Sequence, residues 1–430
     1  MASTNKRVLY FEYKVFLLIC LLFVAMAFIF DRPADIIQGL GRILSERGLL
    51  ITDYMTVGGL GASIINSTLV SIYAVAVLHI MRVKPSGAMI MALWMSAGWS
   101  YWGANVLNIL PLTTGVWLYS RYKGIPFSNC AVAALICHTI APIVSLFYIS
   151  NPIMLHLGVQ WPLIVNLLIG IAIGLICGFI MPIVLSTMTR FHDGFTLYNM
   201  GVAGGVIAVF IAALFYGAGV PIPTESMWYY ERQAEQAIFL YVIFVSLILL
   251  GLFTGGGKFG RHFENIKELV AHPGHALNDF HSLFGDTAYI NMGLLGIIGT
   301  TWALVFGLGL NAGIFACVFS MAAFGSLGKH IKNVIPLLIG ASLCAYLNVL
   351  DFASPTNALA ILFSTCLAPI AGKFGFFWGV VAGFLHVLMV IHIGPVTNGL
   401  NLYNNGFCSG FVALFLVPII VGLKREKRDS

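Results

Sequence analysis

The sequence predicts an all-helical integral membrane protein with about fourteen membrane segments arranged as two inverted repeats of seven. The composition indicates a membrane environment, because 59% of the 430 residues are hydrophobic and 9% are charged, whereas soluble domains carry about 25% charged residues. Apolar runs of roughly 20 residues, the length of a membrane-spanning helix, recur along almost the whole chain. Two polar patterns also occur twice, in the same order, which gives the repeat.

The clearer repeated pattern reads G-x-x-L-Y-N-x-G and occupies residues 194–201 and 399–406. The second is a set of Gly, Asn, Pro, Leu and Gly at identical spacing. It comprises Gly103, Asn108, Pro111, Leu112 and Gly115, which recur as Gly328, Asn333, Pro336, Leu337 and Gly340. Patterns that recur in this way indicate one structural unit present twice.

The predicted membrane segments follow one another with short connections. In chain order they are 15–31, 58–81, 86–102, 104–120, 128–150, 161–188, 195–218, 237–256, 283–307, 309–327, 333–350, 354–372, 374–396 and 400–422. The run 15–31 follows basic residues, as a signal peptide would. It lacks a clear small-residue cleavage site, and further segments follow it, so we interpret it as an uncleaved first helix.

The charges between segments predict the orientation. With the N-terminus inside, every basic cluster from Arg82 and Lys84 to Lys424–Arg428 falls on the cytoplasmic side, and the acidic stretch from Glu225 to Glu235 falls outside. The prediction is a multi-pass protein of the bacterial inner (plasma) membrane with both termini in the cytoplasm.

The spacing of the repeats predicts that the two halves are inverted. Each pattern recurs seven segments later, and units separated by an odd number of crossings face opposite ways. The first repeat then covers residues 1–225 and the second covers 226–430. Inverted repeats are typical of secondary transporters and of some channels, because the halves can exchange conformations around a midplane site.

Candidate solute-binding residues are the polar side chains that occur in pairs. They are Asn66 and Asn291, Asn108 and Asn333, Tyr198 and Tyr403, and Asn199 and Asn404. We predict that the fourth, seventh, eleventh and fourteenth segments are broken or re-entrant, because prolines and glycines at matching positions of two halves mark such sites. The structural alternatives are a packing kink at each proline, with the asparagine bonding the freed carbonyl, and a glycine face for helix packing.

Charged candidates within the apolar segments are few. Asp286 is the predicted ion-coupling residue for Na⁺ or H⁺, and it would approach Asn291 only if its segment starts unwound; a helix cap is the alternative. Lys329, His330 and Lys332 either attract anions or mark the cytoplasmic side. His138, His386 and His392 are expected as hydrogen-bonded core groups rather than proton relays.

Other function classes lack their signatures. The eight cysteines lie in apolar runs without metal-binding spacing, so they are expected to be core residues and no metal is expected. No hydrolase, metalloprotease, Walker or dinucleotide motif occurs, so an enzyme is not expected, nor is any cofactor beyond the coupling ion. No basic, aromatic-rich soluble patch suggests nucleic acid. The expected partners are a small polar solute and membrane lipids, and a homo-oligomer is left open.

Over its full length the chain resembles an uncharacterised family of bacterial polytopic membrane proteins without a named activity. Its seven-plus-seven plan is similar to that of nucleobase and sulfate carriers, and its glycine-bounded intramembrane asparagines resemble those of urea channels; both are likenesses of fold alone. The function we predict is a secondary transporter that moves a small polar neutral or anionic solute by alternating access. The alternatives are a passive, urea-channel-like channel and, third, a membrane-embedded transferase that uses His138.

Overall fold

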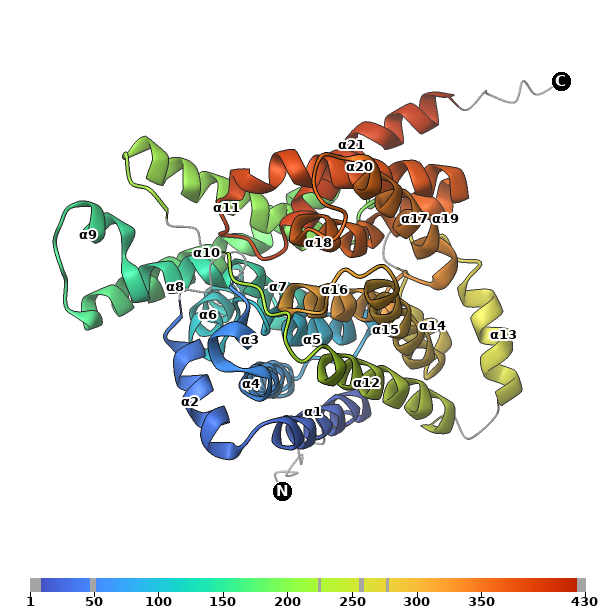
Figure 1. Cartoon of the computed structure of the whole chain (residues 1–430), viewed down its shortest axis with the longest axis horizontal. Helices are drawn as coiled ribbons and strands as arrows, with labels where there is room; N and C mark the ends of the chain where they lie inside the picture. Colours follow the sequence, from blue (N-terminus) through green and yellow to red (C-terminus); the bar gives the residue numbers. More distant parts are fainter. Residues whose placement is uncertain (1–8, 47–51, 223–225, 255–258, 276–277, 424–430) are drawn as a thin grey trace.

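The computed structural model describes residues 9–46, 52–222, 226–254, 259–275 and 278–423, which form helices joined by short loops (Figure 1). Each of the fourteen predicted segments coincides with a helix or a broken helix. Within the described ranges, ten helical segments are long and apolar enough to cross a membrane. The terminal basic residues and Glu225, on which part of the predicted orientation depends, lie outside these ranges.

The elements of the first half run to residue 217. They are α1 Phe11–Phe30, α2 Pro33–Leu44, α3 Tyr54–Gly58, α4 Leu60–Ile80, α5 Gly87–Trp99, α6 Val106–Lys123, η1 Phe127–Asn129, α7 Ala131–Ile136, η2 Cys137–Ile140, α8 Ala141–Ser150, α9 Pro152–His156, α10 Leu163–Phe191 and α11 Asn199–Gly217.

The elements of the second half begin at residue 233. They are α12 Gln233–Thr254, α13 Phe259–Leu269, α14 Phe280–Phe284, α15 Thr287–Val305, α16 Ala312–Ala323, η3 Phe324–Ser326, α17 Ile331–Leu347, α18 Pro355–Phe363, η4 Ser364–Leu367, α19 Ala368–Phe374, α20 Phe376–Ile393, η5 Gly394–Thr397 and α21 Asn404–Leu423.

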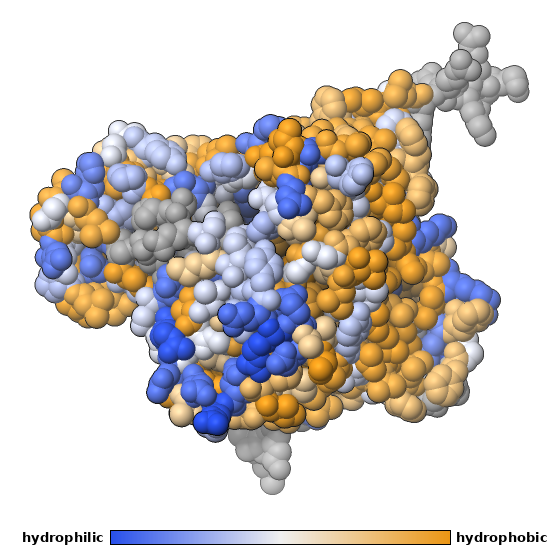
Figure 2. All heavy atoms as spheres, viewed as in Figure 1, coloured by the Kyte–Doolittle hydropathy of each residue, from blue (hydrophilic) through white to orange (hydrophobic). Residues whose placement is uncertain are grey.

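The outer surface has the character expected of a protein in a bilayer. Large apolar side chains stand exposed along α10, where Leu163 is 73% exposed and Leu168 is 58% exposed. Hydrophobic residues cover much of the face shown in Figure 2, while hydrophilic residues gather in limited patches. Such extensive apolar exposure is rare on soluble proteins. We conclude that the chain is a multi-pass helical membrane protein.

The short helices α5 and α16 form the centre of the fold, and they pack against each other. Every residue of α16 is buried, as is all of α5 except Ala88. The two helices run antiparallel, because Ser326, just beyond α16, donates a hydrogen bond to the carbonyl of Gly87 at the start of α5 (2.9 Å). Helices without an exposed face can only be hydrophobic all round, which agrees with their sequences.

Around this centre, helices at matching positions of the two halves make matching contacts. α1 packs on α4 as α12 packs on α15, and α6 packs on α10 as α17 packs on α20. The glycines repeat as well: Gly178 lies against the backbone of Leu112, and Gly383 lies against that of Leu337. Close packing through small residues is how helices associate within a membrane.

The structure corrects the predicted position of the breaks. Helices α6 and α17 continue through Pro111 and Pro336, and α11 and α21 are continuous helices preceded by irregular chain. The interruptions lie instead in the fifth and twelfth segments, where η2 separates α7 from α8 and η4 separates α18 from α19. A Pro follows each break, in the sequence Ala-Pro-Ile, so the helix restarts with proline in its first turn, where its missing N–H is tolerated.

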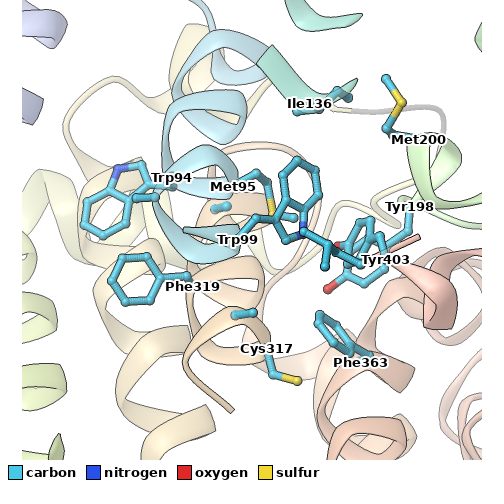
Figure 3. Close-up of a cluster of buried hydrophobic side chains, with 14 of the residues drawn as sticks. Trp94, Met95, Trp99, Ile136, Tyr198, Met200, Cys317, Phe319, Phe363 and Tyr403 are labelled. Atoms are coloured by element: carbon cyan, nitrogen blue, oxygen red, sulfur yellow. The ribbon is translucent and has the colours of Figure 1, made fainter. Parts of the chain in front are cut away.

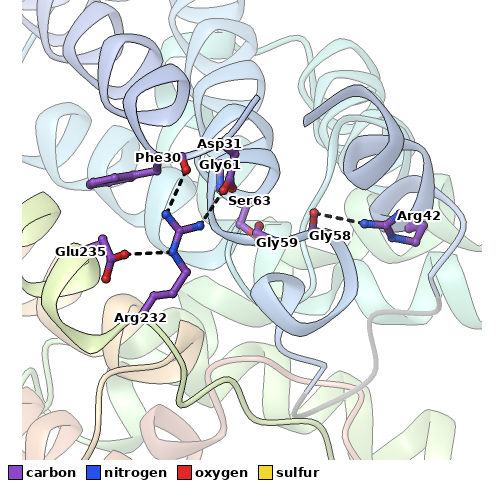
Figure 4. A network of polar contacts seen from close by, with 9 residues as sticks. All are labelled: Phe30, Asp31, Arg42, Gly58, Gly59, Gly61, Ser63, Arg232 and Glu235. Carbon is purple, nitrogen blue, oxygen red and sulfur yellow. Dashed lines mark hydrogen bonds and ion pairs between the residues drawn. The ribbon is translucent and has the colours of Figure 1, made fainter. Parts of the chain in front are cut away.

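A polar cluster ties the loop before α12 to the first helix (Figure 4). Arg232 pairs with Asp31 at 2.5 Å and with Glu235 at 3.2 Å, and it donates to the Phe30 carbonyl at 3.0 Å. The other oxygen of Asp31 accepts from the backbone N–H of Gly61 at the start of α4 (2.6 Å). The cluster therefore joins the end of α1 to the starts of α4 and α12.

Candidate functional site

Two tyrosines of the repeated pattern meet at the centre of the molecule. The ring centroids of Tyr198 and Tyr403 lie 4.2 Å apart, and both side chains are buried. Trp99 packs against Tyr403 at 5.3 Å, and Phe324, its counterpart in the second half, packs against Tyr198 at 5.0 Å. Figure 3 shows Trp99, Tyr198 and Tyr403 in one aromatic cluster, with Phe363 beside Tyr403. The predicted pair of tyrosines is thus brought together.

Each tyrosine is positioned by an exchange of backbone hydrogen bonds between the halves. The N–H of Leu197 donates to the carbonyl of Cys366 in η4 (2.9 Å), and the N–H of Leu402 donates to the carbonyl of Thr139 in η2 (2.8 Å). The broken helices supply these carbonyls, since a 3₁₀ turn leaves backbone groups that an α-helix would pair. The breaks are therefore the docking points for the two tyrosine loops.

Glycines set how closely the two tyrosine elements approach. A Cβ atom built on Gly201 would lie 2.6 Å from the Tyr403 carbonyl oxygen and 2.7 Å from the Gly406 Cα, and one on Gly406 would lie 2.9 Å from the Gly201 Cα. Contacts under 3.0 Å are essentially unknown for real Cβ atoms. The helices α11 and α21 consequently cross backbone to backbone at these two equivalent positions.

A chain of hydroxyl groups joins the tyrosines to a buried lysine. Ser320 Oγ lies 2.5 Å from Tyr198 Oη and 2.7 Å from Tyr403 Oη. Lys329 Nζ donates to Tyr198 Oη at 2.5 Å and to Thr365 Oγ1 at 2.9 Å. Lys329 is 0% exposed, although the sequence places it in a basic cluster. Its side chain therefore does not lie on the surface, and among the described residues it takes part in no ion pair.

A cavity of about 330 Å³ lies next to the tyrosine pair, on the side of α5, α7 and α10. Its walls come from α5, η1, α7 and α10, and Tyr198, Tyr403 and Phe324 reach it from the centre. The polar residues at its exposed end are Asn129, Ser186 and Thr189. None of the described lining residues is an Asp or a Glu. Its size is near the lower limit for small-molecule sites, which are about 300–1,000 Å³.

Asn199 lines this cavity, whereas Asn404 does not. Asn199 Nδ2 donates to Leu185 O and to Thr189 Oγ1, and its oxygen contacts His192 Nε2 at 2.9 Å. Asn404 Nδ2 donates to the backbone carbonyl of Gly394 (2.5 Å), which lies ten residues before it, as Thr189 lies ten residues before Asn199. Both amides therefore join the start of a long helix to the end of the preceding one, and of the two only Asn199 borders this cavity.

The predicted pair Asn66 and Asn291 binds backbone carbonyls in the same way in both halves. Asn66 Nδ2 donates to the carbonyls of Ser100 (2.6 Å) and Ala104 (3.0 Å). Asn291 Nδ2 donates to the carbonyls of Gly325 (2.8 Å) and Lys329 (2.7 Å), which occupy the matching positions of the second half. These amides satisfy carbonyls in the turns that follow α5 and α16, and neither lines the cavity.

Asn108 and Asn333 form matching capping boxes at the starts of α6 and α17. The oxygen of Asn108 accepts from the Asn105 N–H, and its Nδ2 donates to the Gly103 carbonyl at 2.8 Å. Asn333 does the same with the His330 N–H and the carbonyl of Gly328 (2.9 Å). The amides thus cap the helix starts rather than bond the carbonyls freed by the prolines, and neither lines the cavity.

Asp286 lies away from the tyrosine cluster. It is half-buried and directly precedes α15. The irregular chain is at the preceding residue, Gly285, which has a positive φ, while Asp286 itself has helical dihedrals and makes no capping hydrogen bond. Among the described residues, no hydrogen bond or ion pair joins it to Asn291.

Two acids that were not among the predicted site residues link the halves. Asp53 accepts from the N–H of Ala312 at the start of α16 (2.9 Å) and from that of Tyr229. Asp279 accepts from the N–H of Gly87 at the start of α5 (3.0 Å). Each half thereby caps the central helix of the other, as acids at helix N-termini do. Burial raises the pKa of Asp53 to about 6, and the backbone N–H donors oppose that shift. Its position just outside predicted segment 58–81 concealed it.

A larger cavity of about 630 Å³ lies between α10 and α11. Its lining is almost wholly apolar and includes Ile176, Phe210 and Leu214, which are 61%, 70% and 74% exposed. A site for a polar solute needs a few convergent polar groups, which this cavity lacks. The smaller cavity over the tyrosines is therefore the better candidate.

Comparison with known proteins identifies a family without an assigned activity. The family described as "Protein of unknown function (DUF1576)" matches residues 32–216 and 259–421. The chain belongs to this family. The first matched stretch ends at α11 and the second begins at α13. The first helix of each half, α1 and α12, therefore lies outside the matched residues. No curated protein and no solved structure matches the chain.

Proposed function

We propose that this membrane protein is a secondary transporter in which two inverted seven-segment repeats carry a small polar, neutral or anionic solute by alternating access. The contacts that recur at matching positions of the two halves support the repeat, and the antiparallel pair α5 and α16 supports its inversion. A topology of this kind allows the halves to exchange conformations around one site.

The observation that carries the proposal is the unequal packing of the two halves around the tyrosine pair. On the side of the first half, Met95 and Ile136 line an open cavity. Their counterparts in the second half, Ser320 and Phe363, contact the tyrosines directly. One side open and the equivalent side packed is the arrangement expected for one of two alternating states.

Cysteine labelling tests the alternation without knowledge of the solute. The eight native cysteines are buried, so a membrane-impermeant maleimide should have little background. We expect Ser186→Cys, at the open end of the cavity, to react from one side of the membrane. Ile391→Cys, at the matching position of the second half, should react slowly from the other side. Cross-linking that holds the first site closed should raise the reactivity of the second. Reactivities that do not change in opposite directions would refute alternating access.

Transport itself is tested in proteoliposomes with solutes first identified by thermal stabilisation of the purified protein, since a ligand of the folded state raises stability by RT ln(1 + [L]/Kd). Accumulation against a concentration gradient supports the carrier. Flux that never exceeds equilibration supports the passive channel instead. Chemical turnover of a lipid or acyl substrate would replace both with the membrane-embedded enzyme.

A further inference from the structure

The surroundings of Lys329 lack a partner for its charge. Its Nζ lies 4.4 Å from the centroid of the Tyr198 ring and 5.4 Å from that of Phe324, and it donates to two hydroxyl oxygens. An ammonium has three donors, and removal from water without an opposite charge favours its neutral form. Burial accordingly lowers the pKa of Lys329 to about 7, and a nearby anion would raise the pKa again. In the described part of the chain no carboxylate pairs with it.

This lysine stands one layer of side chains behind the cavity. Tyr198 and Phe324 contact Lys329 and also line the cavity. A lysine that donates to a phenol oxygen makes that phenol a stronger donor, because hydrogen bonds in a chain polarise one another. Lys329 is therefore separated from the cavity by the side chains of Tyr198 and Phe324 alone.

The rest of the cavity does not oppose a negative ligand. Its described lining contains no acid, and most of it is apolar, with Met91, Met95 and Met200 among the side chains. An apolar wall lowers the local dielectric and strengthens the effect of a nearby charge. The cavity thus combines space for an apolar body with one buried lysine behind its inner end, whose positive charge a bound anion would stabilise.

The repeat indicates that the charge is a specialised feature of one half. The position equivalent to Lys329 in the first half is Ala104, while the neighbouring contacts are otherwise matched. Lys332, three residues later, is exposed, so it offers a matched control of the same residue type.

We propose that the cavity over Tyr198 and Tyr403 binds a small monoanion with an apolar body, of the monocarboxylate class, and that Lys329 supplies the compensating positive charge. The inference names the solute class for the proposed transporter and rests on that function. The cavity admits one small molecule, and the single lysine provides for one negative group.

The test compares benzoate with benzamide, which share an apolar ring and differ in charge. Both are titrated against the purified full-length protein, and binding is read by calorimetry and as the rise in melting temperature. We expect the unmodified protein to bind benzoate at least tenfold more tightly than benzamide. Lys329→Met should abolish this preference, and Lys332→Met should retain it. The same comparison with cyclohexanecarboxylate and its amide covers a different apolar body.

Equal binding of anion and amide by the unmodified protein, or no binding of either pair, would overturn the proposal, and neither result requires a variant to fold. Retention of the anion preference in a folded Lys329→Met protein would also overturn it. Failure of the transport function has a different signature: anion preference that depends on Lys329, with no uptake of benzoate by proteoliposomes. If proteoliposomes take up neutral solutes and Lys329→Met does not change this uptake, the proposed transport function stands and the proposed anion specificity does not.

Discussion

Substitution of Gly201 by alanine tests the contact on which the two halves are joined. The new Cβ would lie 2.6 Å from the Tyr403 carbonyl oxygen and 2.7 Å from the Gly406 Cα, so the backbones must separate by more than about 0.5 Å to reach an ordinary contact. Overpacking of a core costs about 1–3 kcal/mol, and two backbone clashes place this variant near the upper value. Alanine in a helix recovers about 1 kcal/mol, which leaves a net loss of about 2 kcal/mol.

The matched control is Gly217→Ala at the other end of the same helix, where a Cβ meets nothing within 4 Å. Its stability should stay the same or rise by up to about 1 kcal/mol. Both variants are compared by SDS unfolding in mixed micelles and by melting temperature. If Gly201→Ala unfolds at the same SDS fraction and temperature as Gly217→Ala, or is more stable than the unmodified protein, then α11 and α21 do not cross at Gly201 and Gly406.

Three further predictions have defined outcomes. Asn66→Ala and Asn291→Ala each leave two buried backbone carbonyls without a hydrogen-bond donor. Each should therefore lower the free energy of unfolding by about 1–3 kcal/mol in the same unfolding assay. Unequal losses would contradict the equivalence of the two asparagines. The pKa of Asp53 is raised to about 6 in the folded protein, so the contribution of Asp53 to stability is present below about pH 4 and is lost as the pH rises to about 6. Melting temperatures of Asp53→Asn should lack this pH dependence. Tyr198→Phe should destabilise the protein more than Tyr403→Phe, by about 1 kcal/mol, since only the first hydroxyl accepts from a lysine; equal losses would argue against a charged partner.

Segment positions could be predicted from the sequence because they depend on composition alone. A run of about 20 apolar residues can satisfy its backbone in a membrane only as a helix, and the structure confirms a helix or broken helix at every predicted segment. The breaks were assigned to the wrong segments. Proline breaks a helix only when the lost hydrogen bond is not replaced, and near the starts of α6 and α17 the helix persists. The breaks at η2 and η4 depend instead on the loops that bind them, a tertiary contact that no local pattern records.

The candidate site was predictable in the part that repeats. Tyr198 and Tyr403 are conspicuous as a repeated pair, and they meet. The six asparagines are equally conspicuous, yet all of them donate to backbone carbonyls. For Lys329 the sequence left two interpretations open, attraction of anions or a cytoplasmic signal, because its neighbours His330 and Lys332 resemble a loop signal. A usable signal did exist: the spacing that relates the two asparagine-proline patterns also places Lys329 opposite Ala104. Its burial, however, follows from how α16 and α17 meet.

The differences between equivalent residues give the two proposed states different energies. If both halves were identical, an inverted pair of states would be equally populated. In the state with the open cavity Ser320 reaches both tyrosine hydroxyls, whereas its counterpart Met95 has no group that could do so in the opposite state. Opening the second half would therefore break these hydrogen bonds and expose Lys329 to the cavity. We expect that state to need a ligand with a negative or hydrogen-bonding group, and a solute shifts an equilibrium only as far as its affinities for the two states differ.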